Sequence, residues 1–153
     1  MPVDLGPAFL VDFAGTPPQI STDDLMLWET FRRLFRTDYV RFFFDVSVGT
    51  GEDSPPNVSA KVAAAWRRLT KFRIDVVGEK ADGWDIIELR PNAGPGAIGA
   101  LQTYTTLWFE GPPDKRPIRP LLVSDRCASD IRRVAGLAGI TLRCLDEFSA
   151  RSN

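Results

Sequence analysis

Two acidic residues in the middle of the chain have the type and spacing needed for metal-dependent chemistry. Asp75 lies in one apolar run, and Glu88 lies in the next, followed by Leu89 and Arg90. If these runs are strands joined by a turn, they pair antiparallel and the two carboxylates come close together. Two carboxylates with a backbone carbonyl form the all-oxygen site that Mg²⁺ or Mn²⁺ prefers. Such an ion activates water and stabilises the charge that builds on a phosphate.

The rest of the composition narrows the chemistry further. The chain has no histidine, which excludes Ser–His and Cys–His catalytic pairs and the usual zinc sites that contain histidine. Catalysis therefore has to rest on carboxylates, Lys, Arg, Tyr or a hard metal ion. Two cysteines, Cys127 and Cys144, do not make a disulfide framework, so we expect small, buried and reduced thiols in an intracellular setting.

Length, charge and hydrophobic pattern indicate the general class of protein. A chain of 153 residues with 44% hydrophobic residues fits one domain with a sizeable core. The formal net charge of −1 gives no global positive field, so contact with nucleic acid has to come from a local patch. The N-terminal sequence lacks the pattern of a signal peptide, and no apolar run reaches membrane-spanning length. We therefore expect a protein that is not secreted and has no membrane partner.

The elements expected to position the two acids alternate between helices and strands. Hydrophobic periodicity and turn signals predict the following order: an arm (1–20), a helix (22–36), a strand (39–48), a helix with the stripe Val58, Val62, Trp66 and Leu69, strands (72–78 and 84–90), a helix (96–109), a strand (118–123), a helix (126–136) and a strand (140–145). Residues 149–153 are expected to form a tail, which leaves one domain at 21–148. This order predicts an α/β fold of the α+β kind, in which helices flank a central mixed sheet.

Four local expectations follow from the patterns. The strand at 39–48 alternates Val40, Phe42, Phe44, Val46 and Val48 with Arg41, Asp45 and Ser47, which predicts one buried face. Ser124 is expected to cap the helix that begins near residue 126. The arm carries large apolar residues, so we expect it to pack on its own domain or on a neighbour. The four tryptophans are expected to be core or interface anchors.

Taken with this element order, the motifs resemble the PD-(D/E)XK nuclease superfamily, and in particular its RecB-type exonucleases. The segments 73–75 (RID) and 86–90 (IIELR) are similar to the two parts of the family signature. The resemblance covers about residues 22–125, with a helix inserted after the first strand. It implies a restriction-endonuclease-like core, with metal binding by Asp75, Glu88 and the Leu89 carbonyl. It also implies catalytic roles for Asp75, Glu88 and Arg90.

Other positions match the family less closely. The segment 99–108 (GALQTYTTLW) resembles a family helix that carries Gln and, four residues later, Tyr. Gln102 is the fourth catalytic candidate, but Thr106 stands where the Tyr is expected and the tyrosine is Tyr104. Glu29 matches a glutamate that some members carry in the first helix. The main departure is Arg90, because the family has Lys there and arginine does not give up a proton.

These departures favour one function over two others. The first is a nuclease-like domain that cuts weakly or not at all and serves as an adaptor subunit of a phage particle, near the neck or tail. Its partners would be other protein subunits of an assembly, with DNA as a further candidate partner. Its location would be the virion or the host cytoplasm, and it would need no cofactor. The alternative is an active DNA nuclease that uses Mg²⁺ or Mn²⁺, and the third is a regulator that binds a host protein.

A simpler interpretation of the same residues stays open. Asp75 and Glu88 then form the solvated side of a half-buried sheet, and Arg90 is a cross-strand partner of Asp75. Gln102 is then a surface glutamine on an amphipathic helix. The arginines at 32, 33, 36, 67 and 68 are then solvated helix faces and not a patch that binds DNA.

Overall fold

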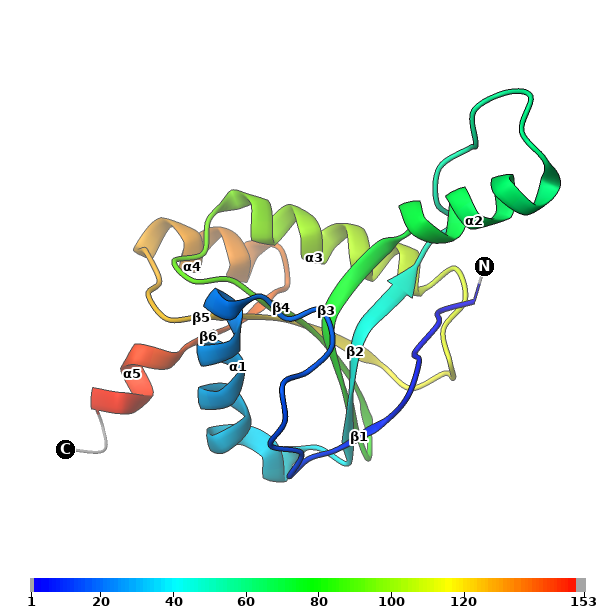
Figure 1. Cartoon of the computed structure of the whole chain (residues 1–153). Coiled ribbons are helices and arrows are strands. Elements are labelled where there is room, and N and C mark those ends of the chain that lie inside the picture. Colours follow the sequence, from blue (N-terminus) through cyan, green and yellow to red (C-terminus); the bar gives the residue numbers. More distant parts are fainter. Residues whose placement is uncertain (1, 151–153) are drawn as a thin grey trace.

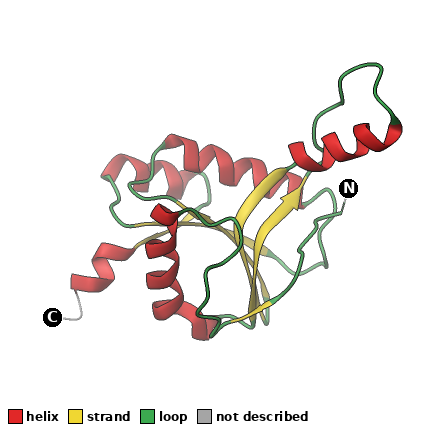
Figure 2. Ribbon diagram, in the orientation of Figure 1, coloured by secondary structure: helices red, strands yellow, loops and turns green. Residues whose placement is uncertain are grey.

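The computed structural model describes residues 2–150, in which a central sheet lies between two layers of helices (Figures 1 and 2). The helices are α1 (Thr22–Phe35), a 3₁₀ turn η1 (Arg36–Asp38), α2 (Ala60–Thr70), α3 (Pro95–Trp108), α4 (Ser129–Leu137) and α5 (Leu145–Ala150). The strands are β1 (Phe9–Leu10), β2 (Arg41–Val48), β3 (Phe72–Lys80), β4 (Gly83–Leu89), β5 (Ile118–Ser124) and β6 (Thr141–Cys144). No helix within residues 2–150 combines the length and the apolar character needed to cross a membrane.

The six strands form one mixed sheet in sequence order, from β1 to β6. Strands β1 to β4 pair antiparallel, whereas β4, β5 and β6 pair parallel through crossovers that contain α3 and α4. This arrangement confirms the α/β fold with a mixed sheet flanked by helices. The helix, the antiparallel meander and the following helix and strand also appear in the expected order.

Each face of the sheet has its own apolar core. On one face, Trp28 and Phe31 of α1 pack against β2 and β3, and Leu145 of α5 joins the same core. On the other face, Leu101 and Trp108 of α3 pack with residues of α4. Because both faces are covered, all seven residues of β4 are buried. Strand β4 is therefore the centre of the molecule.

Strand β2 has two buried faces, whereas the sequence predicted one. Phe43 and Ser47, expected on or near a solvated face, are each 5% exposed because α3 and the arm cover that side. Asp45 has a φ of 53°, in the left-handed region. On either side of it, Phe44 packs in the α1 core and Val46 in the α3 core, so the strand exchanges its faces at this residue. Val40 precedes the strand and is exposed.

The C-terminal part differs from expectation in two ways. Helix α4 begins at Ser129, and Ser124 is instead the last residue of β5, where its hydroxyl accepts a hydrogen bond from Ala93 N–H. Residues 145–150 form helix α5 where the sequence predicted the end of a strand and a tail. Burial of Leu145 and the edge-to-face contact between Phe148 and Phe35 hold this helix against α1.

The N-terminal arm packs on its own domain. Phe9 and Leu10 form the short edge strand β1 beside β2, and Val3 N–H donates to the Gly111 carbonyl. Val3 and Leu5 contact the core on the α3 face, whereas Phe9 contacts the core on the α1 face. The arm therefore covers the edge of the sheet. Of the two expectations for the arm, packing on its own domain is the one that the structure shows.

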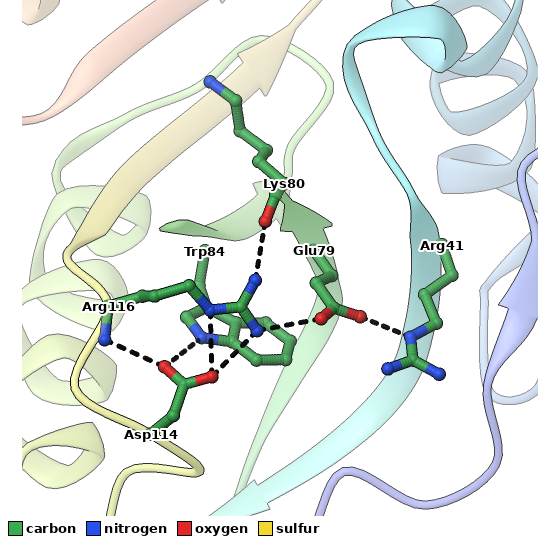
Figure 3. Close-up of polar contacts among 6 residues, drawn as sticks. All are labelled: Arg41, Glu79, Lys80, Trp84, Asp114 and Arg116. Atoms are coloured by element: carbon green, nitrogen blue, oxygen red, sulfur yellow. Dashed lines mark hydrogen bonds and ion pairs between the residues drawn. The ribbon is translucent and has the colours of Figure 1, made fainter. Parts of the chain in front are cut away.

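A polar cluster closes the turn end of the β3–β4 hairpin (Figure 3). The hairpin turns in two residues, since Lys80 pairs with Gly83. Arg116, in the loop before β5, donates to the Lys80 carbonyl, to Glu79 and to Asp114, each at 2.8 Å. Its guanidinium also lies 4.7 Å from the centre of the Trp84 ring. The cluster thereby fixes the hairpin and the start of β5 to each other.

Cys127 and Cys144 form a disulfide, which corrects the expectation of two reduced thiols. Their Cα atoms are 5.9 Å apart, within the range that a disulfide needs. The sequence did not reveal this pair because the two cysteines meet only through the parallel pairing of β5 with β6. That pairing brings the residues after β5 beside the last residue of β6.

We expect removal of this disulfide to destabilise the domain. The bond closes a loop with a sequence separation of 17 residues, so its loss in Cys127→Ser/Cys144→Ser should cost about 3 kcal/mol of unfolding free energy. Urea denaturation of the wild type and the double variant measures the difference. Alkylation of the unfolded wild type should label the cysteines only after reduction, and labelling without a reductant would contradict the bond.

Candidate functional site

The register of the β3–β4 hairpin brings Asp75 and Glu88 together. The ladder pairs Val76 with Ile87 as its last rung, and Asp75 and Glu88 are the next residues on the two strands. Beyond this rung the strands separate, and the Asp75 carboxylate accepts a hydrogen bond of 3.0 Å from Leu89 N–H instead. The two acids therefore lie beside each other at the open end of the hairpin, as the antiparallel pairing predicted.

Burial makes both carboxyl groups of this pair weaker acids than usual. Glu88 is 1% exposed, and burial together with the neighbouring Asp75 raises the pKa of its carboxyl to about 8, against the opposing effect of Arg90. Burial also raises the pKa of Asp75, although the hydrogen bond from Leu89 N–H opposes the shift. The negative charge of Asp24 adds to it. Burial therefore favours the neutral form of both carboxyl groups.

Two buried acids of β4 differ in how well they are satisfied. Asp85, also 1% exposed, accepts hydrogen bonds from Tyr39 at 2.5 Å and from Arg119 at 2.6 and 3.0 Å. Glu88 Oε1 pairs with Arg90 Nε at 2.8 Å, and the carboxyl groups of Glu88 and Asp75 are close enough to share a proton. Glu88 Oε2 is buried and meets no N–H or hydroxyl donor among residues 2–150. Unsatisfied buried acceptors are uncommon and need an explanation. Glu88 is therefore the acid of β4 with capacity for a further contact.

Three other residues surround the pair. Arg90 directly follows β4, and it forms its ion pair with Glu88 on the same strand and not with Asp75 across the hairpin. Tyr104 of α3 is 8% exposed, and its pKa is raised by burial and by the charges of Glu88 and Asp75. Asp24 lies in the first turn of α1, near Asp75. Carboxylates, a phenol and a guanidinium thus meet where β3 and β4 separate.

Two residues that the sequence suggested lie elsewhere. On α3, Leu101, Tyr104 and Trp108 face the sheet, so Gln102 is exposed on the outer side of the helix beside Thr106. Glu29 is exposed on α1 among arginines of the same helix. The residues that lie near Asp75 and Glu88 are Tyr104 and Asp24. The helical period that joins Leu101 to Trp108 passes through Tyr104, and this signal could have identified it from the sequence.

The donor set does not fit a Mg²⁺ or Mn²⁺ ion as it is arranged. One oxygen of Asp75 is bound to Leu89 N–H, and one oxygen of Glu88 is bound to the cationic Arg90. No group of three or more acidic, cysteine or histidine side chains converges here in the described part of the chain. A divalent ion would also be repelled by the guanidinium at 2.8 Å from Glu88. Arg90 would have to leave Glu88 before an ion could bind.

Comparison with known proteins gives weak structural similarities. No family model matches the chain, and no curated protein matches it. The crystal structure of AF1548, a protein of unknown function, has a TM-score of 0.44 and 15% identity over 76% of this chain and 55% of AF1548. VC1899 from Vibrio cholerae has a TM-score of 0.49 and 14% identity over 81% of this chain and 30% of VC1899. The chain thus spans about half of the first and under a third of the second, and what it does has to be inferred from its own residues.

The raised pKa of Glu88 should make stability depend on pH. The pKa is raised from 4.5 to about 8 on folding, so between these values the folded state binds the proton more tightly than the unfolded state. Stability contributed by this group therefore falls as pH rises from about 5 to about 9. We expect the melting temperature of the wild type to decline over this range more steeply than that of Glu88→Gln. Equal slopes for both proteins would contradict this, and the exposed Glu110 provides a control as Glu110→Gln.

Proposed function

We propose that this chain is a nuclease-like domain that cuts DNA weakly or not at all and serves as an adaptor subunit in a protein assembly. The single observation that carries the proposal is the ion pair of 2.8 Å between Arg90 and the buried carboxylate of Glu88. This contact places a permanent cation on the acid that a metal-dependent nuclease would use to hold its ion. In addition, Arg90 stands where the similar nucleases have a lysine, the side chain that would exchange a proton with the attacking water.

The surroundings of the pair support the same proposal. Besides Asp75 and Glu88, the carboxylate of Asp24 lies near this end of the sheet. Clustered negative charge repels a phosphate backbone unless metal ions neutralise it. The chain as a whole has a net charge of −1 and so offers no long-range attraction for DNA.

The proposed adaptor role requires a surface that contacts another protein. A helix with an uncovered apolar stripe, described below, gives the domain a surface suited to protein contact. A phage particle, with the domain near the neck or tail, is the setting that we propose, because a small chain whose basic residues are mostly arginine is similar to bacteriophage proteins. In such an assembly its partners would be other protein subunits.

An active DNA nuclease that uses Mg²⁺ or Mn²⁺ is the second candidate. The observation that favours it is the buried and unpartnered Glu88 Oε2 beside Asp75. If Arg90 moved away from Glu88 when DNA bound, both acids and the Leu89 carbonyl would be free to hold an ion, and Arg90 would contact the scissile phosphate.

Cleavage of plasmid and single-stranded DNA with Mg²⁺ or Mn²⁺ separates the two candidates. We expect the wild type to cut no faster than Glu88→Ala. We also expect Arg90→Lys to cut faster than the wild type, because lysine can release a proton and holds Glu88 less firmly. Arg126→Lys is the matched control, since it makes the same exchange after the neighbouring strand β5. Metal-dependent cutting by the wild type that disappears in Glu88→Ala would overturn the proposal.

A further inference from the structure

Helix α2 projects from the body of the molecule with an uncovered apolar stripe. In Figure 1 it lies beyond the ends of β2 and β3, away from the two helical layers. None of its residues is buried. Val62, Trp66 and Leu69 are 50%, 38% and 76% exposed and recur at helical spacing along one side. A stripe of this kind on a projecting helix marks a surface that another molecule covers.

The helix is firmly built despite its exposure. Ser59 caps its first turn by accepting a hydrogen bond from Val62 N–H. At its other end, Glu52 N–H donates to the Thr70 hydroxyl at 2.7 Å. Gly51, with a φ of 75°, packs so closely that a Cβ there would lie 1.9 Å from the Arg67 carbonyl oxygen. These contacts present the apolar stripe on a defined platform.

Charge around the helix is strongly one-sided. Residues 54–74 contain five of the 19 basic residues of the chain and none of its 20 acidic ones. The remainder of the chain, with 14 basic and 20 acidic residues, therefore carries a net charge of −6. Arg67 and Arg73 pair with Asp53 and Asp45, while Lys61, Arg68 and Lys71 have no acidic partner among the described residues. The occupant of this surface should therefore be apolar and acidic.

A groove with this chemistry lies on the same chain, on the side of the molecule away from α2. It has a volume of about 310 Å³ and runs between α1, α5 and the carboxyl ends of β4 and β5. Its lining contains three carboxylates and no basic residue: Asp23, Met26, Leu27, Thr30, Pro91, Asp125, Leu145 and Asp146. Met26 is 76% exposed. The groove therefore offers both apolar surface and negative charge.

We propose that the apolar stripe of α2 docks into the Asp125–Asp146 groove of a second copy of this chain. The stripe would cover Met26, while Lys61 and Arg68 would face the carboxylates of the groove. Because the two surfaces differ and lie on opposite sides of the molecule, the contact is head-to-tail, and repetition gives a ring or a filament. This inference rests on the proposed adaptor role and specifies one of its partners.

Two other occupants fit the surface less well. If two α2 helices paired with each other, two basic segments would meet, each with Lys61, Arg68 and Lys71 lacking an acidic partner among the described residues, and like charges oppose such a contact. Single-stranded nucleic acid would match the basic residues and Trp66. However, Val62 and Leu69 would then remain exposed, because aliphatic side chains provide no stacking surface for bases.

Sedimentation velocity over a range of protein and salt concentrations tests the proposal. We expect the wild type to associate as concentration rises and to dissociate at high salt. Leu69→Glu should weaken association at least about tenfold, a loss of about 1.4 kcal/mol. Leu137→Glu is the matched control, because Leu137 is an 86% exposed leucine near the end of α4. A wild type that stays monomeric, or equal loss in both variants, would overturn the proposal.

Mixing two deficient variants gives the sharper test. Met26→Lys/Asp146→Lys places positive charge in the groove and leaves α2 intact, whereas Leu69→Glu leaves the groove intact. Each should be monomeric alone with an unchanged circular dichroism spectrum. Mixed together, they should form a 1:1 dimer that grows no further, because the intact α2 of one variant docks into the intact groove of the other. A mixture that stays monomeric would instead exclude the head-to-tail contact.

Two further readouts separate this inference from its alternatives. Fluorescence anisotropy with a labelled single-stranded oligonucleotide reports binding to nucleic acid, and tight binding by a monomeric wild type that is lost in Arg68→Glu would reassign α2. The cleavage assay is independent of association. Cutting by the wild type would overturn the adaptor role, whereas absence of both cutting and association would overturn only the head-to-tail contact.

Discussion

The pairing of β3 with β4 is the constraint on which the rest of the structure depends. Its two-residue turn fixes the register from Lys80 opposite Gly83 to Val76 opposite Ile87. Strand β4 is buried throughout, and it joins the antiparallel half of the sheet to the parallel half. A shift of one residue would move Glu88 and Asp85 to the opposite face and leave buried charges without partners.

The two ends of this hairpin have opposite character. At the turn, Arg116 neutralises Glu79 and Asp114 and covers Trp84, so both acids of this cluster have a cationic partner. At the open end, Asp75 and Glu88 share one nearby cation, Arg90, and the pKa of each is raised. Buried ionisable groups whose pKa values are strongly shifted are typical of functional sites, although structural networks of ion pairs also produce such shifts. Here the cationic partners are concentrated at the turn, and buried carboxyl groups with less compensation lie where the strands separate.

Basic and acidic residues are also distributed unevenly over the whole chain. Within residues 2–150, basic residues without an acidic partner lie on the projecting α2 segment (Lys61, Arg68 and Lys71) and on α1 and η1 (Arg32, Arg33 and Arg36), whereas Asp125 and Asp146 lie at the carboxyl ends of the parallel strands. A domain that cut DNA would need positive charge around its carboxylates, whereas the basic residues of the α2 segment lie on a helix with an exposed apolar stripe. Such a distribution suits association between protein surfaces of opposite charge.

The sequence by itself determined the element order, the mixed sheet and the proximity of Asp75 to Glu88. Periodicity and a tight turn are local signals, and antiparallel neighbours in sequence need no distant information. Tertiary structure alone decided the disulfide, the helix α5, the burial of both faces of β2 and the choice of Tyr104 over Gln102. Each of these depends on which surfaces meet across the sheet. Parallel pairing and packing between layers join residues that are far apart in the chain, and no local pattern records such contacts.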